Sequence, residues 1–181
     1  MSERSDENLM AMVQQEKLIH LEPLFLRYQK QLYNYFLKCT LDREASQDLT
    51  QSAFIRVMKY RHSFGINRSF RVWLFQIARN LVRDHFQDNP DIHESFDPDK
   101  HSPEDAGEAI TEEQLARETR LHKAMALLPA DKRELVVLAK LQGMKYEDIA
   151  KIRNTSTGAV KVQVHRAIAQ LRVCYFGETH E

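Results

Sequence analysis

The sequence predicts an all-α protein of two small helical domains joined by an acidic flexible linker, the C-terminal domain carrying a helix-turn-helix. Glycine and proline are scarce, with five of each in 181 residues, and Leu, Ala, Lys, Glu, Arg and Gln dominate long runs. Apolar residues in those runs recur every three or four positions, which is typical of helices with one buried face. A proline-containing acidic stretch divides the runs, so we expect domains at 1–87 and 111–181 with a linker at 88–110.

The formal net charge is zero, but the charges are unevenly distributed. Residues 1–87 hold 13 Lys and Arg against 9 Asp and Glu, and residues 120–181 hold 11 against 6. Residues 88–119 hold 2 against 11. Two mildly basic helical blocks around an acidic connector suit two modules that each meet a polyanion, although ordinary surface charge would also give imbalances of this size.

The first block predicts two helices after a polar N-terminal segment, Met1 to Val13, which we expect to be a loose tail or a first half-turn. From Gln14 to about Cys39 the apolar residues step by three and four, and Pro23 marks a start or a kink. Asp42 is a good N-cap for a second helix that ends near Tyr60. That helix is expected to bury one face: Leu49, Ala53, Phe54, Val57 and Met58. Its polar side shows Gln47, Asp48, Gln51, Ser52 and Lys59.

A loop and a third helix complete the first block. Gly65 and Asn67 indicate a turn, and Ser69 can cap the helix that follows. Its apolar stripe is Phe70, Trp73, Leu74, Ile77, Ala78 and Leu81, and a polar line at spacing four contains Gln76, Asn80 and Asp84, flanked by Arg79 and Arg83. Basic residues mixed with Phe64, Phe70 and Phe75 suit single-stranded DNA; the alternative is that these rings are core.

The last block predicts a helix from about Thr111, where T-E-E-Q can form a capping box, to a stop at Pro129. We expect Asp131 to cap the next helix and Gly143 to end it. Tyr146 to Arg172 then shows a short amphipathic segment, a polar break and a longer basic segment, which predicts a helix-turn-helix rather than a plain helical hairpin. The inner face of the second helix is Val160, Val164, Ala167, Ile168 and Leu171.

Several classes of protein are disfavoured. The sequence contains no nucleotide-binding glycine motif, nucleophile elbow or zinc-protease motif, and its eight histidines lack metal-ligand spacing, so no catalytic residue, metal or cofactor is expected. No apolar run approaches the ~20 residues of a membrane span, and the N-terminus lacks a signal-peptide core. Cys39 and Cys174 are far apart and suit a reducing cytoplasm; the sequence leaves open whether either has a redox role.

Two motif blocks resemble the extracytoplasmic-function (ECF) type of RNA polymerase sigma factor in the sigma-70 family. DLTQSAFIRV (48–57) and FRVWLFQIARNLVRD (70–84) resemble the regions that bind the polymerase clamp and the −10 promoter element. LLPADKREL (127–135), YEDIA (146–150) and GAVKVQVHRA (158–167) resemble the region that binds the −35 element. The resemblance implies a promoter-specificity subunit, not an enzyme.

The resemblance also implies residue roles. The residues expected to bind core polymerase, at the clamp helices of its largest subunit, are Asp48, Gln51 and Ser52. Those expected to read the −10 element and capture an unstacked base are Phe64, Asn67, Arg68, Gln76, Arg79, Asn80, Arg83 and Asp84. Those expected at the −35 duplex are Thr157, Gly158, Lys161, Val162, His165 and Arg166. Relative to the family pattern, Ser156 replaces a proline and Ala159 a threonine, which weakens a phosphate contact there.

The expected partners are core RNA polymerase (clamp helices and flap region), promoter DNA and an anti-sigma factor, in the bacterial cytoplasm and on the nucleoid when active. The acidic linker would pass through the polymerase as a nucleic-acid mimic, or act as a plain solvated spacer. The rival interpretations are an autonomous helix-turn-helix regulator and a helical interaction module that mimics a sigma domain. The promoter sequence, the activating signal and the identity of the anti-sigma factor are not readable from the sequence.

Overall fold

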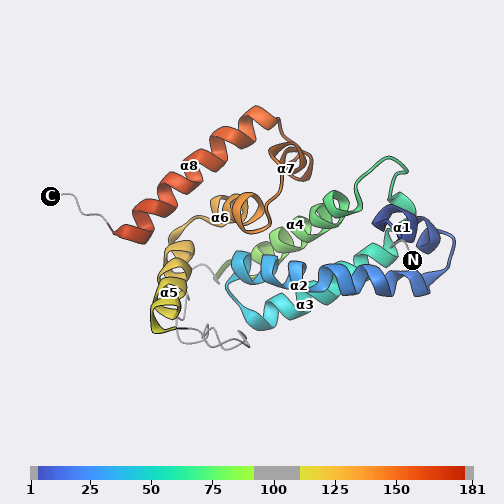
Figure 1. Ribbon diagram of the computed structural model, residues 1–181, viewed down its shortest axis with the longest axis horizontal. Coiled ribbons are helices and arrows are strands. Elements are labelled where there is room, and N and C mark those ends of the chain that lie inside the picture. Colours follow the sequence, from blue (N-terminus) through green and yellow to red (C-terminus); the bar gives the residue numbers. More distant parts are fainter. Residues whose placement is uncertain (1–3, 92–110, 178–181) are drawn as a thin grey trace.

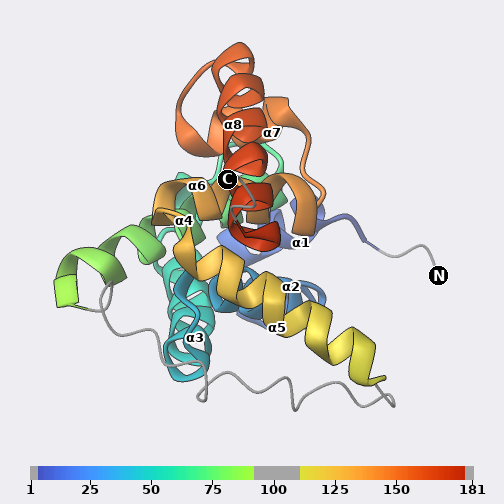
Figure 2. The ribbon, with the colours of Figure 1, turned by 90° about the vertical axis from the view of Figure 1, so that its left-hand side faces the viewer.

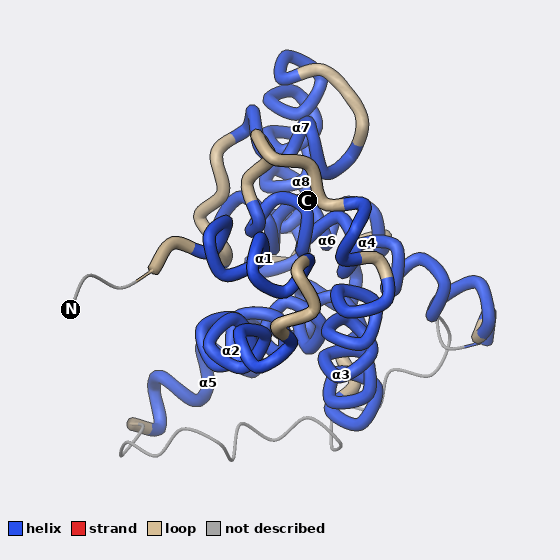
Figure 3. The backbone as a smooth tube through the Cα atoms, turned by 90° about the vertical axis from the view of Figure 1, so that its right-hand side faces the viewer, coloured by secondary structure: helices blue, strands red, loops and turns tan. Residues whose placement is uncertain are grey.

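The expected helices are present in a computed structural model of the chain, which describes residues 4–91 and 111–177. Within those ranges the regular structure is helical (Figure 3). The first block holds α1 (Asp6–Gln14), η1 (Leu18–His20), α2 (Leu21–Thr40), α3 (Arg43–Lys59), η2 (Arg61–Ser63) and α4 (Phe70–Asp88). The second holds α5 (Glu112–Leu127), α6 (Ala130–Val136), η5 (Val137–Leu141), α7 (Tyr146–Arg153) and α8 (Thr157–Phe176).

Helix starts follow the predicted capping residues in most places. Asp42 and Ser69 accept hydrogen bonds from the backbone of α3 and α4, and Thr111 forms a capping box with Gln114. Pro23 lies in the first turn of α2, where a proline is tolerated. Asp131 does not cap α6: Pro129 holds the N-cap position, and the Asp131 carboxylate pairs with Arg153 instead.

The N-terminal segment is more ordered than the sequence predicted. Ser5 caps α1, and Leu9, Met10 and Val13 are buried against the first domain. The Glu7 carboxylate also accepts a hydrogen bond from the backbone N–H of Phe70 at 3.2 Å. The segment predicted as a loose tail or a first half-turn is instead a docked helix of nine residues, because three buried apolar side chains hold a short helix that has little stability alone.

The central helix α4 is buried on more than one side. It packs on α2 and α3 through the predicted stripe, and α7 of the second domain contacts it from another side (Figure 1). Apolar residues of α4 outside the predicted stripe are buried as well: Val72, Phe75 and Val82. The Phe75 ring lies edge-on to Tyr35 of α2. The aromatic rings of Phe64, Phe70 and Trp73 pack together, with the Phe64 and Trp73 ring centroids 5.2 Å apart. The predicted apolar stripe is confirmed for Phe70 and Trp73, and Phe64 is buried with them, so of the two interpretations of these rings the core is the correct one.

The two domains share one hydrophobic core. Residues of both blocks belong to the same buried cluster, and α2 contacts α6 and η5 while α4 contacts α7. Figures 1 and 2 show α2 and α3 on one side of α4, with α7 and α8 on the other. Most of the predicted linker, 92–110, lies outside the described residues, as do 1–3 and 178–181. The boundaries predicted at 87 and 111 fall next to the observed end of α4 and start of α5.

Candidate functional site

The helix-turn-helix has the geometry that the sequence predicted. Asn154 takes a left-handed conformation at the end of α7, and Ser156 caps α8 by accepting from the Ala159 N–H at 3.1 Å. The buried side of α8 is formed by Val160, Val164 and Ala167. A short helix, a tight turn and a longer helix with one free face form the motif that lays a helix in a DNA groove.

The opposite side of α8 is a solvent-exposed basic surface. Lys161, Val162, His165 and Arg166 are all exposed there, as expected. They line a groove of about 550 Å³ together with Lys140 of η5, Tyr146 of α7 and Arg172. Among the described residues that line the groove, four are Lys or Arg and none is Asp or Glu. This charge and shape suit a phosphate-flanked base edge.

Thr157 and Gly158 lie in the first turn of α8 and are exposed. The free N–H groups of a helix N-terminus attract phosphate, which is consistent with the predicted backbone contact. The Ser156 hydroxyl is engaged as the cap, so the residue that replaces the family's proline has a structural role here.

The polymerase-facing surface expected on α3 is also exposed. Asp48 and Gln51 are exposed and Ser52 is half-buried. Ile55 and Met58 lie beside them at 58% and 39% exposure, although Met58 was predicted to be buried. Ile55 follows Gln51 by one helical turn, so its spacing from the motif residues was the available signal for this apolar patch.

Some of the residues expected at the −10 element are exposed to solvent, and others are buried or bonded to other protein groups. Asn80 and Arg83 are exposed, and the Asp84 carboxylate accepts from Arg56 at 2.8 Å. Asn67 and Arg68 are exposed in the loop before α4, where Ile66 is 93% exposed. Phe64 is only 6% exposed and supports this loop from the core, so its ring is not available for base stacking in this arrangement.

Gln76 and Arg79 contact the second domain. The Gln76 side chain donates to the Lys151 carbonyl of α7 at 3.0 Å and lies 3.4 Å from an Arg68 nitrogen. Arg79 donates to the Glu134 carboxylate at 3.3 Å. Sequence reasoning missed Glu134, because nothing in KRELVV indicates that this acid meets another domain.

The buried Cys39 thiol lies close to Glu134 and Tyr35. Burial raises the pKa of the Cys39 thiol well above its ordinary value, so the thiol stays protonated and is a poor nucleophile.

Among residues 4–91 and 111–177 no cluster of His, Cys, Asp and Glu could hold a metal ion. None of the helices described is long and apolar enough to cross a membrane.

Fold and surfaces together define a two-domain helical protein with a helix-turn-helix. The family models for Sigma-70 region 2 and Sigma-70, region 4 match residues 24–90 and 118–171. The chain is 31% identical to the RNA polymerase sigma factor CarQ of Myxococcus xanthus, over 83% of this chain and 86% of that one. It is 28% identical to the ECF RNA polymerase sigma factor SigX of Bacillus subtilis, over 82% and 80% of the two chains.

A solved structure with a similar fold is that of the sigma factor RpoE in complex with the anti-sigma factor NepR from Bartonella quintana. The TM-score is 0.67 at 24% identity, over 87% of this chain and 97% of that one. The chain belongs to the sigma-70 family, in its extracytoplasmic-function group of RNA polymerase sigma factors. It acts in promoter-specific transcription initiation and is not itself an enzyme.

Proposed function

We propose that the exposed side of α8 reads the −35 duplex through Lys161, Val162, His165 and Arg166. The observation that carries this assignment is the basic groove of α8, which contains no carboxylate. Arg166 can pair with a guanine and Val162 can contact a thymine methyl group. Thr157 and Gly158 would hold a backbone phosphate at the helix N-terminus.

We propose that the loop before α4 and the polar side of α4 bind the unstacked −10 strand. Asn80 offers both a donor and an acceptor to a base edge, while Asp84 can only accept, which favours a base amino group. Asn67, Arg68, Gln76, Arg79 and Arg83 supply further polar and cationic contacts. Phe64, being buried, would act by supporting the loop that presents Asn67 and Arg68.

We propose that Asp48, Gln51 and Ser52 on α3 dock on the clamp helices of the polymerase largest subunit. The exposed apolar side chains of Ile55 and Met58 extend this surface and support a protein partner, because exposed apolar side chains grouped beside polar ones mark interfaces. The second domain would meet the flap region of the polymerase.

The experiment that tests this function is run-off transcription with purified core polymerase and a promoter library. Asn80→Ala should change −10 sequence preference while core binding stays intact, and Gln87→Ala, also exposed on α4, should change neither. Loss of core binding in a folded Asn80→Ala variant would refute the assignment of that face. Failure of the wild-type protein to bind core polymerase would refute the whole proposal.

An anti-sigma partner is proposed because a sigma factor of similar fold has been solved in complex with an anti-sigma factor. The protein would then work in the cytoplasm, held by that partner until a signal releases it to the nucleoid. Co-purification of the full chain with the product of the adjacent gene would test this proposal; absence of any complex would count against it.

A further inference from the structure

The first half of α5 is a helical segment that lies on the surface of the protein. Every residue from Glu112 to Arg120 is exposed. The helix packs against α8, and its buried residues, Ala124 and Met125, lie near its C-terminal end. In Figures 1 and 2 the N-terminal end of α5 projects from the other helices.

This exposed segment is held as a helix by local interactions. Thr111 and Gln114 form the capping box, and Arg117 pairs with Glu113 one turn before it. A few helical turns without tertiary support are only marginally stable in water. A second surface packed along the segment would therefore stabilise it.

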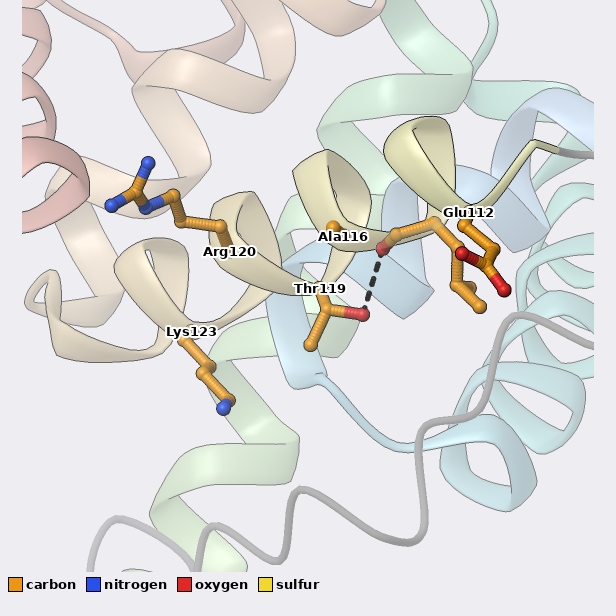
Figure 4. A pocket seen from close by; sticks show the side chains of 6 residues that line it. Glu112, Ala116, Thr119, Arg120 and Lys123 are labelled. Atoms are coloured by element: carbon orange, nitrogen blue, oxygen red, sulfur yellow. Dashed lines mark hydrogen bonds between the residues drawn. The ribbon is translucent and has the colours of Figure 1, made fainter.

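One side of the segment carries a distinct set of residues. The described residues that line the pocket drawn in Figure 4 all belong to α5: Glu112, Leu115, Ala116, Thr119, Arg120 and Lys123. Residues spaced by three and four positions share one side of a helix. The apolar side chain of Leu115 is 41% exposed at the centre of this side. The Thr119 hydroxyl donates to the Leu115 carbonyl at 2.9 Å, so its proton is satisfied within the helix.

The charges on this side are separated along the helix. Figure 4 shows Glu112 at one end of the pocket and Lys123 toward the other. The Arg120 guanidinium lies over the Tyr175 ring of α8, 5.3 Å from the ring centroid, so its charge is directed to that ring. The side therefore has an acid at its N-terminal end, small and apolar residues at its centre, and a free base at its C-terminal end.

We propose that this side of α5 pairs with the same side of α5 in a second copy of the chain, and that the two helices run antiparallel. A two-fold axis between positions 117 and 118 places Glu112 of each copy opposite Lys123 of the other, because residue contacts across such an axis are reciprocal. Leu115 of each copy then packs on Thr119 of the other. The small side chain of Ala116 lets the helix axes approach closely.

Charge complementarity favours this partner and this direction. A parallel pair would place Glu112 beside Glu112 and Lys123 beside Lys123, whereas the antiparallel pair gives two ion pairs of opposite sign. None of the six residues that line the pocket is assigned to DNA or to polymerase above, so the inference does not rest on the proposed function. Only one helix of each copy takes part, and so small an interface gives a weak dimer that forms as the concentration rises.

The first part of the test is sedimentation equilibrium of the full chain from about 1 µM to about 1 mM, a range that covers weak association. The mean mass should rise from that of one chain toward that of two. Glu112→Lys and Lys123→Glu, each alone, place like charges opposite one another and should weaken dimerisation roughly tenfold. The two substitutions together restore opposite charges and should restore the dimer.

Glu118→Lys is the matched control for these charge reversals. Glu118 is exposed on another side of α5, so this variant should associate as the wild-type protein does. Circular dichroism checks that the helical content of each variant is unchanged. Lys123→Glu covers the case in which a lysine at position 112 frays the first turn, because Lys123 lies well inside the helix.

The second part tests the register by cross-linking. The two-fold axis brings residue 116 of the two copies within reach of a disulfide, so Ala116→Cys in a Cys174→Ser background should give a covalent dimer under mild oxidation. Glu118→Cys should not, and the buried Cys39 thiol stays unreactive.

Three outcomes would overturn the inference. The first is a chain that stays monomeric over the whole concentration range. The second is a dimer that neither charge reversal weakens. The third is a dimer that Ala116→Cys does not cross-link. The last two would assign association to another surface.

Discussion

The two candidate DNA surfaces differ in what covers them. The side of α8 that carries Lys161 and Arg166 is exposed and lines an open groove. The side of α4 that carries Gln76 and Arg79 is bonded to the second domain. Both surfaces sit on basic helices of similar length, so length and charge do not explain the difference. The second domain packs on α4, whereas the exposed side of α8 has no such cover among the described residues.

The comparison shows that whether one side of a polar helix stays exposed depends on which other elements pack against it. The helix-turn-helix completes its own core with Val160, Val164 and Ala167, which leaves the other face of α8 free. By contrast, α4 carries buried apolar residues such as Phe75 and Val82 beyond its first stripe, and the Phe75 ring packs edge-on against Tyr35 of α2. A helix that is apolar on several sides is a buried helix.

The largest effect is expected from Arg133→Met. The buried Arg133 guanidinium donates to the carbonyls of Met125, Ala126 and Leu128 and to that of Cys39 in α2. Loss of these bonds leaves buried carbonyls without a donor and should lower the free energy of unfolding by about 3 kcal/mol or more, measured by urea denaturation. The exposed Arg117→Met control should cost at most about 0.5 kcal/mol. Equal losses would show that Arg133 does not join the domains.

The exposed side of α8 is tested by Arg166→Ala. Loss of a bidentate contact to guanine should weaken binding to a −35 duplex by ~1–3 kcal/mol, with unfolding unaffected because the side chain is exposed. Footprinting and duplex titration measure this effect, with Arg117→Ala as the control. An unchanged −35 footprint would remove Arg166 from the reading surface.

The N-terminus of α8 is tested by Ser156→Ala. The Ser156 hydroxyl accepts from the Ala159 N–H, and loss of such a cap typically costs about 1 kcal/mol, whereas Ser156→Gly should cost only a few tenths. Thermal unfolding monitored by circular dichroism distinguishes the two variants. If the alanine and glycine variants are equally stable, the cap does not support the recognition helix.

The smallest effect is expected from pH, because two arginines compensate the Glu134 charge. Burial raises the pKa of Glu134 in the folded protein, and unfolding returns it toward the ordinary glutamate value. The folded protein consequently binds more protons, so this contribution to stability is complete below the ordinary pKa and is lost as pH rises through the raised one. The free energy of unfolding, measured by urea denaturation, should therefore fall as pH rises through this range. Glu134→Gln should abolish this dependence; a dependence that survives in the variant would assign it to another group.

Much of the fold follows from patterns that act over a few residues. Helix starts at Asp42, Ser69 and Thr111 were predictable because a capping side chain bonds to backbone only three residues away. The exposure of Lys161, Val162, His165 and Arg166 on α8 was predictable from helical spacing alone. The predicted N-cap role of Asp131 was wrong, because its carboxylate pairs with Arg153. Arg153 is 22 positions away, so local capping rules do not consider it.

Short-range spacing and motif order are enough to predict most of the helices, the helix-turn-helix and the sigma-70 family. Long-range packing is needed to show that Phe64 is core, that α1 is docked, and that Gln76 and Arg79 contact the other domain. The Tyr35–Glu134 hydrogen bond joins residues 99 positions apart, and the Arg79–Glu134 pair joins residues 55 apart. Such partners meet only when two independently patterned helical blocks pack together, so no local signal could place a buried carboxylate between two arginines.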